Sequence, residues 1–228
     1  MSLKPKIWIF GHSVCLPYGL AEGTQGWADI LSNKLGFDLI NFARPATDNF
    51  FIYQCYLHYK NQIRKQDIVI ISWSHYSRKS FVLNRSLESQ TSVLDNSLHY
   101  VTGDHEFIRS VNTSVNNATK WLVMKPINRG IAYYDNWFEN YYNPYEQKCN
   151  FQSYFDSVRL TCTGQYIPFF LSKESVEDID ISGIPNAGYM VEFILENNVM
   201  IGSDDIHLNE YGHKLWAEQI FKAIDSKT

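Results

Sequence analysis

Short apolar runs alternate with helical repeats along the first third of the chain. Residues 7–10 and 68–71 are continuous apolar runs, which are typical of strands buried inside a parallel sheet. Between them, apolar residues recur at helical spacing over 27–35, and Gly36 follows as a stop signal. The full pattern predicts strands over 6–10, 38–43, 67–72 and 166–171, and helices over 27–35, 50–63, 151–160 and 209–224.

This alternation is typical of βαβ units, in which crossover helices join parallel strands. The chain has 228 residues, of which 45% are hydrophobic, and this is enough for one domain with a substantial core. We therefore predict a single α/β domain over residues 1–228. Its central, mainly parallel sheet should have about five strands and lie between helices.

The regular pattern weakens between residues 79 and 165. Polar stretches alternate there with short apolar pieces, so this segment is predicted to be an insertion that contains some helix. Within it, residues 131–145 are densely aromatic. Two interpretations stay open for these aromatic residues: a platform on which sugar rings stack, or ordinary packing in a core or interface.

The charge balance argues against nucleic acid as a partner. The chain has 20 Lys and Arg against 24 Asp and Glu, and the basic residues are scattered. No apolar stretch approaches the ~20 residues of a membrane-spanning helix, so we predict a cytoplasmic protein. The alternative that a leader was removed before Met1 stays open. The 4 cysteines show no Cys-x-x-Cys spacing and are predicted to be reduced.

Three residues near the two ends of the chain have the chemistry of a nucleophile, a base and an orienting carboxylate. Ser13 follows the first predicted strand, at the edge where an α/β sheet presents reactive side chains. Asp204 stands three positions before His207 near the other end. A serine hydroxyl needs an imidazole to take its proton, and a carboxylate can orient that imidazole.

Each of these residues also has an ordinary structural interpretation. Ser13 fits a turn or a helix cap. Asp204 and His207 fit a loop carboxylate and a helix-capping histidine, and the neighbouring Asp205 fits a solvated side chain. A metal site that combines Asp204 and His207 with His213 lacks a recognised ligand spacing, so no metal is predicted. His213 itself is predicted to lie on the surface of the last helix.

The order of these motifs resembles that of the SGNH, or GDSL-type, hydrolases over nearly the full chain. Gly11, His12 and Ser13 stand where that family has Gly-Asp-Ser after its first strand, with histidine in place of the aspartate. Asp204 and His207 stand before the last helix, where the family has Asp-x-x-His. The resemblance implies a flavodoxin-like three-layer α/β/α sandwich and a serine nucleophile.

The resemblance also implies an oxyanion hole, in which fixed hydrogen-bond donors stabilise the developing negative charge. The N–H of Ser13 is one predicted donor, and Ala46 stands in place of a glycine that provides another. The family's Gly-x-Asn-Asp block is not kept at 73–76, where His75 either replaces the amide donor or packs beneath the site. The candidate substrate-binding residues are Arg44, Ser74 and Arg78, and the two arginines also fit ordinary ion pairs.

The predicted function is hydrolysis of carboxylic esters through an acyl-enzyme. Ser13 attacks, His207 transfers the proton and Asp204 orients His207. The expected substrate is a small acyl ester, and an acylated saccharide is slightly preferred because no long apolar lid is evident. No metal or organic cofactor is required. Two alternative functions stay open: an O-acyltransferase that uses the same serine, and a noncatalytic carbohydrate-binding module. The sequence does not indicate the oligomeric state.

Overall fold

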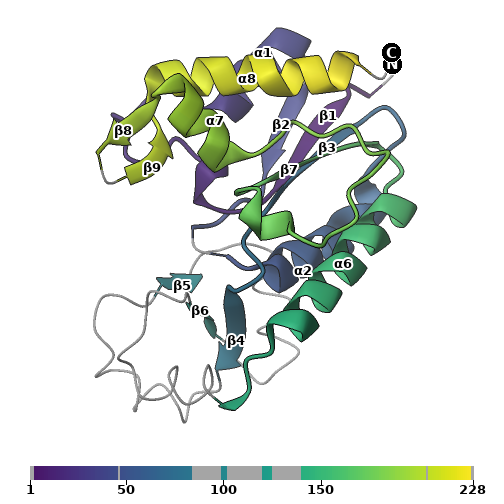
Figure 1. Ribbon diagram of the computed structural model, residues 1–228. Coiled ribbons are helices and arrows are strands. Elements are labelled where there is room, and N and C mark those ends of the chain that lie inside the picture. The colour runs from purple at the N-terminus through teal and green to yellow at the C-terminus, as the bar shows by residue number, and fades with distance from the viewer. Residues whose placement is uncertain are drawn as a thin grey trace.

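Four parallel strands form the central sheet of the protein, in the order β2-β1-β3-β7 (Figure 1). They are β1 (Lys6–Phe10), β2 (Asp38–Asn41), β3 (Ile68–Trp73) and β7 (Gln165–Phe170). The structure is a computed structural model, and it describes residues 3–45, 47–83, 99–101, 120–124, 140–203 and 205–226.

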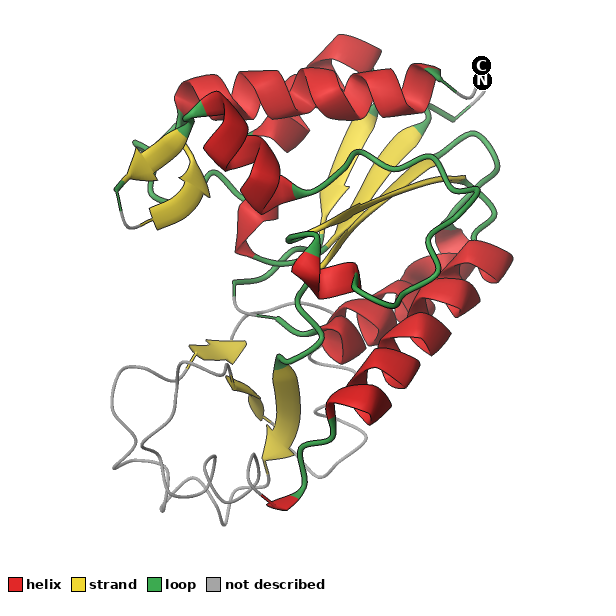
Figure 2. Cartoon of the chain, in the orientation of Figure 1, coloured by secondary structure: helices red, strands yellow, loops and turns green. Residues whose placement is uncertain are grey.

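Helices cover both faces of this sheet and give a three-layer α/β/α sandwich (Figure 2). One face carries α1, α7 and α8, and the other carries α2 and α6. This arrangement confirms the predicted fold class. The helices are α1 (Trp27–Leu35), α2 (Asn49–Tyr59), α6 (Pro144–Thr161), α7 (Met190–Asn197) and α8 (Glu210–Asp225).

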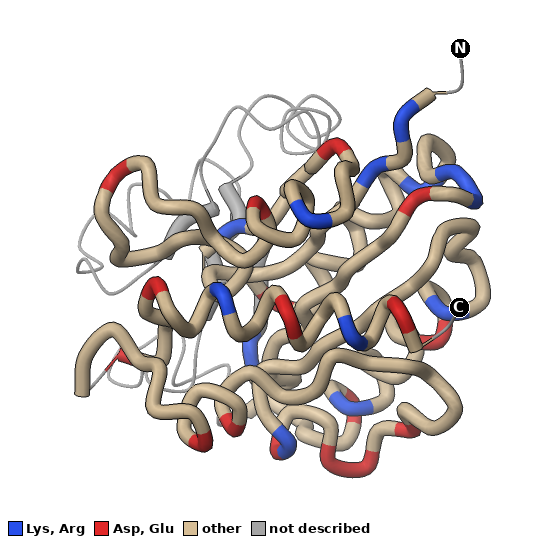
Figure 3. The backbone as a smooth tube through the Cα atoms, turned by 90° about the horizontal axis from the view of Figure 1, so that it is seen from above, with Lys and Arg blue, Asp and Glu red and all other residues tan. Residues whose placement is uncertain are grey.

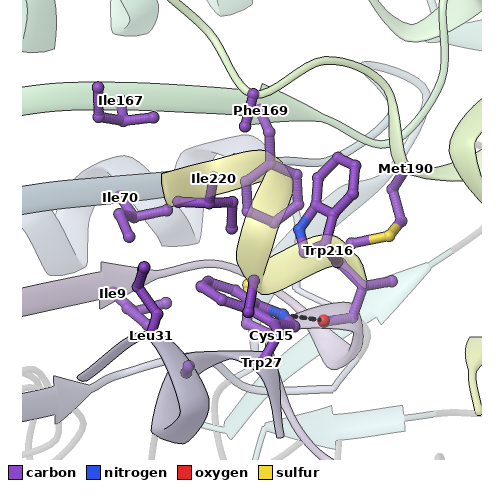
Figure 4. Close-up of a cluster of buried hydrophobic side chains, with 14 of the residues drawn as sticks. Ile9, Cys15, Trp27, Leu31, Ile70, Ile167, Phe169, Met190, Trp216 and Ile220 are labelled. Atoms are coloured by element: carbon purple, nitrogen blue, oxygen red, sulfur yellow. Dashed lines mark hydrogen bonds between the residues drawn. The ribbon is translucent and has the colours of Figure 1, made fainter. Parts of the chain in front are cut away.

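Successive residues of β1 enter two different cores. Ile7 and Ile9 pack in the core beneath α1 and α8, which Figure 4 shows, whereas Trp8 and Phe10 pack in the core beneath α2 and α6. None of the four is more than 1% exposed. A strand covered on both faces needs an apolar residue at every position, which is why the run over 7–10 is continuous rather than alternating.

The central sheet has four strands among the described residues, where the sequence predicts about five. Residues 187–189 pass along β7 at the place where a fifth strand would lie. There, Phe170 donates its N–H to the carbonyl of Gly188 (3.1 Å), and Ala187 donates its N–H to the carbonyl of Pro168 (3.0 Å). Among the described residues, this passage pairs with β7 through one isolated parallel bridge, between Phe170 and Tyr189. Gly188 has a φ of +101°, which turns the chain out of the extended conformation before α7 begins.

The predicted insertion contains a second sheet as well as a helix. In this sheet, β6 (Lys120–Met124) pairs antiparallel with β4 (Lys79–Leu83) on one side and with β5 (His99–Val101) on the other. Helix α6 begins at Pro144, earlier than the predicted 151, because Asn143 caps it by accepting the backbone N–H groups of Tyr145 and Glu146. Residues 131–139 of the aromatic segment lie outside the described residues.

Acidic and basic residues are interspersed along the described backbone (Figure 3). Of the helices that the structure describes, none has both the length and the apolar composition needed to cross a membrane. All four cysteines, Cys15, Cys55, Cys149 and Cys162, are free thiols, as predicted.

Asp67, directly before β3, holds the amino-terminal edge of the sheet together. Its buried carboxylate accepts the backbone N–H of Lys6 (3.0 Å), the indole N–H of Trp8 (3.1 Å) and three N–H groups of Arg64 (2.8 to 3.2 Å). Burial alone would raise the pKa of Asp67, but the hydrogen bonds, those from Arg64 foremost, outweigh burial and hold this pKa below its usual value.

Replacement of Asp67 by alanine should therefore lower the free energy of unfolding by about 3 kcal/mol, because it leaves the Arg64 cation and two buried donors without their acceptor. Urea denaturation near neutral pH measures this loss. The control is Asp38→Ala, which removes an exposed ion pair with Lys4 and should lower the free energy of unfolding by less than about 1 kcal/mol. Equal losses in the two variants would contradict the role given to Asp67.

Candidate active site

The nucleophile candidate lies directly beyond the carboxyl end of β1. The strand ends at Phe10, and Ser13 is the first residue of a single 3-10 turn, Ser13–Cys15. A Cβ on Gly11 would lie 2.6 Å from Cβ of Ser72 and 2.8 Å from Sγ of Cys15, so only glycine allows this close approach to β3. Burial raises the pKa of Cys15 to about 12, so this neighbouring thiol stays protonated and unreactive.

The base candidate, His207, lies on a two-stranded hairpin near the other end of the chain. Strands β8 (Met200–Gly202) and β9 (Asp205–Leu208) pair antiparallel, and α8 follows directly. Asn209 caps α8 by accepting the N–H of Gly212 (2.8 Å), as the sequence predicts. Asn209 also donates its own N–H to the carbonyl of Val199 (2.8 Å), which fixes the hairpin against the helix.

The hairpin brings His207 to Ser13 across 194 positions of sequence. The distance from Nε2 of His207 to Oγ of Ser13 is 2.8 Å, and that from Nδ1 of His207 to Oδ1 of Asp205 is 2.5 Å. Oδ1 of Asp205 also accepts the backbone N–H of His207 (2.9 Å). The imidazole therefore bridges a hydroxyl and a carboxylate, which is the geometry of a nucleophile, a base and an orienting group.

The backbone N–H of His207 is the main cause of a lowered pKa at Asp205. The imidazole of His207 lowers this pKa further, and partial burial opposes both effects. Asp205 therefore stays ionised near neutral pH and can stabilise a positive charge on the ring. Asp204, to which the sequence analysis assigns the orienting role, lies outside the described residues, so that assignment stays a prediction.

Asp205 is predicted from the sequence only as a solvated neighbour of Asp204 and His207, whereas the structure brings it to the imidazole. Residues two positions apart on a strand point to the same side, so β9 presents Asp205 and His207 together. A spacing of three, as between Asp204 and His207, suits a helical turn instead. A strand predicted at residues 205–208 would have placed Asp205 on the same side as His207 and so indicated it as the orienting carboxylate.

Tyr18 is a second residue of the site that no motif in the sequence indicates. Its ring lies against the imidazole of His207, with centroids 4.5 Å apart and planes inclined by 31°. The tyrosine side chain is 45% exposed, so it forms part of the rim of the site as well as one wall beside His207.

The segment after β2 is joined to the Ser13 turn by hydrogen bonds. Asn41 donates its side-chain amide to the carbonyl of Cys15 (2.9 Å), and Thr47 donates its hydroxyl to the carbonyl of Gly11 (3.0 Å). Arg44 also donates its backbone N–H to Gly11 (3.1 Å). Ala46, the predicted backbone donor of the oxyanion hole, lies outside the described residues.

The segment after β3 is held by Asn49, the first residue of α2. The side chain of Asn49 accepts the N–H of Ser74 (2.7 Å) and donates to its carbonyl (2.9 Å), and Ser74 is fully buried. Nδ1 of His75 accepts the N–H of Ser77 (3.1 Å), so the neutral ring carries its proton on Nε2. Burial lowers the pKa of His75, and Nε2 lies 3.9 Å from Glu174.

The two predicted substrate-binding arginines lie partly buried beside these segments. Nη1 of Arg44 donates to the carbonyl of Ala43 (3.4 Å). Nη1 of Arg78 approaches the carbonyl of Thr47 (3.5 Å). Burial lowers the pKa of Arg78 to about 10, and the carboxylate of Asp48 opposes this effect. Arg78 therefore stays charged near neutral pH.

The prediction that His213 lies on the surface of the last helix is wrong. His213 is 1% exposed, and its Nδ1 accepts the backbone N–H of Trp27 at the start of α1 (3.1 Å). Burial lowers the pKa of His213 from 6.5 to about 4, and the positive charge of a protonated His207 adds to this effect. His213 is therefore neutral at the pH where it accepts this hydrogen bond.

Acid should destabilise the fold through His213. The unfolded chain binds a proton near the ordinary pKa of 6.5 and the native state only near 4. The stabilisation of the native state by neutral His213 is therefore complete above pH 6.5. About 3 kcal/mol of the free energy of unfolding is lost as the pH falls to about 4. Urea denaturation at about pH 7 and pH 4 measures this loss. His213→Asn, which keeps an acceptor but does not titrate, should remove it, and an unchanged pH dependence in this variant would contradict the prediction.

The fold resembles those of two solved structures, one of which is an esterase. EstA, a psychrotrophic esterase from Pseudoalteromonas sp., superposes with a TM-score of 0.50 at 11% identity, over 97% of both chains. TesA superposes with a TM-score of 0.53 at 11% identity, over 96% of this chain and 97% of that one. No family model matches the sequence, and no curated protein sequence is significantly similar to it.

At this level of identity the similarity concerns the fold and not the activity. The four-stranded parallel sheet between helices, in the order β2-β1-β3-β7, agrees with the architecture that the motifs around Ser13 and His207 imply. The chain therefore has the three-layer α/β/α fold of the SGNH hydrolases.

Proposed function

We propose that the protein is a serine-dependent hydrolase of carboxylic esters. The observation that carries this proposal is the position of the His207 ring, whose two nitrogens lie 2.8 Å from Oγ of Ser13 and 2.5 Å from the carboxylate of Asp205. A serine on a buried structural turn has no need of an imidazole that is itself oriented by an ionised carboxylate. A nucleophilic serine requires both.

The first half of the proposed reaction forms an acyl-enzyme. Oγ of Ser13 attacks the ester carbonyl carbon while its proton passes to Nε2 of His207. The tetrahedral intermediate collapses, the bond from the carbonyl carbon to the alcohol oxygen breaks, and His207 gives its proton to that oxygen. Asp205 accepts the N–H at Nδ1 throughout, so it keeps Nε2 free to accept a proton and stabilises the imidazolium that forms.

The second half of the reaction releases the acid. A water molecule attacks the acyl carbon and gives a proton to His207, the bond to Oγ of Ser13 breaks, and His207 returns the proton to Oγ. These steps need only the side chains named, so we propose no metal and no organic cofactor.

The oxyanion that forms in both halves requires fixed donors. As the first residue of its 3-10 turn, Ser13 has an N–H without a partner inside the turn, which makes it the best-supported donor. Ala46 stays a proposed second donor. His75 stays a third candidate, because the tautomer that its contact with Ser77 favours leaves Nε2–H as a donor.

The proposed substrate is a small acyl ester, and an acylated saccharide is one member of this class. The exposed ring of Tyr18 beside His207 offers an apolar contact for one side of such an ester. An O-acyltransferase would use the same acyl-enzyme with a sugar hydroxyl in place of water, so product analysis with and without an added acceptor separates the two reactions.

A fluorophosphonate probe tests the proposal without knowledge of the substrate. One solved structure with this fold, that of EstA, was determined inhibited by monoethylphosphonate. We expect a single covalent adduct on the intact protein, located on Ser13 by peptide mass spectrometry and absent from His207→Ala. A panel of acyl esters, from acetyl to longer chains, should then show turnover. An adduct that is absent or located elsewhere would overturn the assignment and favour a noncatalytic binding module.

A further inference from the structure

A buried tryptophan connects the segment that carries the nucleophile to the helix that follows the base. Trp27 is the first residue of α1 and is 0% exposed. Its indole Nε1–H donates to the carbonyl of Val14 at 2.8 Å, the bond drawn in Figure 4. Val14 directly follows Ser13 in the 3-10 turn. One end of the tryptophan therefore holds the turn that presents the nucleophile.

The backbone of the same residue holds the other catalytic segment. The N–H of Trp27 donates to Nδ1 of His213 at 3.1 Å, and His213 lies in α8, six positions after His207. The first N–H groups of a helix have no partner inside the helix, so this bond satisfies a group that would otherwise be buried alone. Helices α1 and α8 are thus joined at their amino-terminal ends, next to the hairpin that carries His207.

Packing fixes the indole between these two bonds. The ring of Trp27 meets that of Phe169 edge to face, with centroids 5.8 Å apart, and Phe169 in turn meets Trp216 at 5.3 Å (Figure 4). All three side chains are fully buried. A rigid side chain with hydrogen bonds at both ends can set the distance between two segments, which a flexible side chain cannot.

We propose that Trp27 is a positioning residue that keeps Oγ of Ser13 at hydrogen-bond distance from His207. This inference rests on the proposed function. The turn that holds Ser13 is only three residues long, so its orientation depends on contacts from outside. The side chains of Trp27 and Asn41 supply two of these contacts, because they donate to the carbonyls of Val14 and Cys15. A displacement of about 1 Å between reacting groups can lower a rate by about 100-fold.

The test is the variant Trp27→Phe, which keeps a buried ring and removes the indole N–H. We expect the rate constant for fluorophosphonate labelling of Ser13 to fall by about 10-fold to 100-fold. In ester turnover, kcat should fall and KM should stay nearly constant, because the substrate contacts remain. The amide of Leu16, which is bonded to the carbonyl of Ser13 (3.0 Å), should exchange its hydrogen faster.

The matched control is Trp73→Phe. Its indole also makes one buried hydrogen bond of 2.8 Å, to the hydroxyl of Tyr166 in the core on the other face of the sheet. Both variants should lower Tm by about 2–5 °C. Only Trp27→Phe should slow the labelling of Ser13. Equal slowing in the two variants, or wild-type labelling in Trp27→Phe, would overturn the inference.

A second pair of variants covers the case in which Trp27→Phe does not fold. His213→Asn offers an amide oxygen near the place of Nδ1 and should keep the wild-type labelling rate, whereas His213→Leu should lose most of it. Equal labelling rates in His213→Asn and His213→Leu would overturn the positioning role of Trp27 but leave the proposed function intact. An unlabelled wild-type protein would instead refute the proposed function, and the role of Trp27 would fall with it.

Discussion

Replacement of Ser13 by alanine is expected to lower the turnover of a proposed ester substrate by about 10⁵-fold to 10⁶-fold. The variant loses Oγ of Ser13, the proposed nucleophile that would form the acyl-enzyme. His207 would then have no hydroxyl to deprotonate, and the oxyanion donors alone would leave a residual acceleration of about 10³-fold over water. Steady-state assays with the best ester from the panel measure this loss.

The hydroxyl of Ser13 contributes little to the fold, so the loss should be specific to catalysis. Among the described residues, the hydroxyl of Ser13 has its hydrogen bond with the ring of His207. Tm should therefore stay within a few degrees of wild type. Ser32→Ala serves as the matched control, because that hydroxyl donates to the carbonyl of Phe37 at the far end of α1 and should leave turnover unchanged. Turnover that survives in Ser13→Ala would refute a serine mechanism.

The sequence predicted best the elements whose apolar pattern and end signals are local. Strand β1 (Lys6–Phe10) and helix α1 (Trp27–Leu35) have the predicted bounds. The apolar run of β1 is continuous because helices cover the sheet on both sides, and Gly36 ends α1 with a φ of +68° that favours glycine. These signals are local, so a single sequence is sufficient to read them.

The burial of His213 could also have been recognised from the sequence. It stands three positions before Trp216 and seven before Ile220, on the helical repeat that forms the buried face of α8. The polar character of histidine led to a surface assignment. Its Nδ1 is nevertheless satisfied inside the protein by the N–H of Trp27, a residue 186 positions away, and no local pattern indicates such a partner.

The conformation around the base could not be predicted, because strands β8 and β9 are too short to show an alternating pattern. That conformation decides which carboxylate can reach His207. A helical turn would favour a residue three positions away, and a strand favours one two positions away. Asp204 is predicted from the match to Asp-x-x-His, with both side chains on one loop or helical turn. The strand that the structure contains brings Asp205 into contact.

Separate substitution of the two aspartates distinguishes these assignments. Asp205→Asn is expected to lower kcat by about 10³-fold to 10⁴-fold, because an amide can donate to Nδ1 of His207 and so stabilise the tautomer that carries its proton on Nε2. A ring in that tautomer cannot accept the proton of Ser13. The change keeps the size of the side chain, so KM and Tm should change little.

Asp204→Asn is the matched variant, with the same chemistry one position earlier in the chain. It should change kcat by no more than about twofold if Asp205 orients the ring. A large loss in Asp204→Asn and a small one in Asp205→Asn would instead assign the orienting role to Asp204, as the motif spacing implies. Large losses of kcat in both variants would mean that both carboxylates are needed to orient His207. The pair of measurements therefore shows whether this site follows the spacing of the motif or the geometry of strand β9.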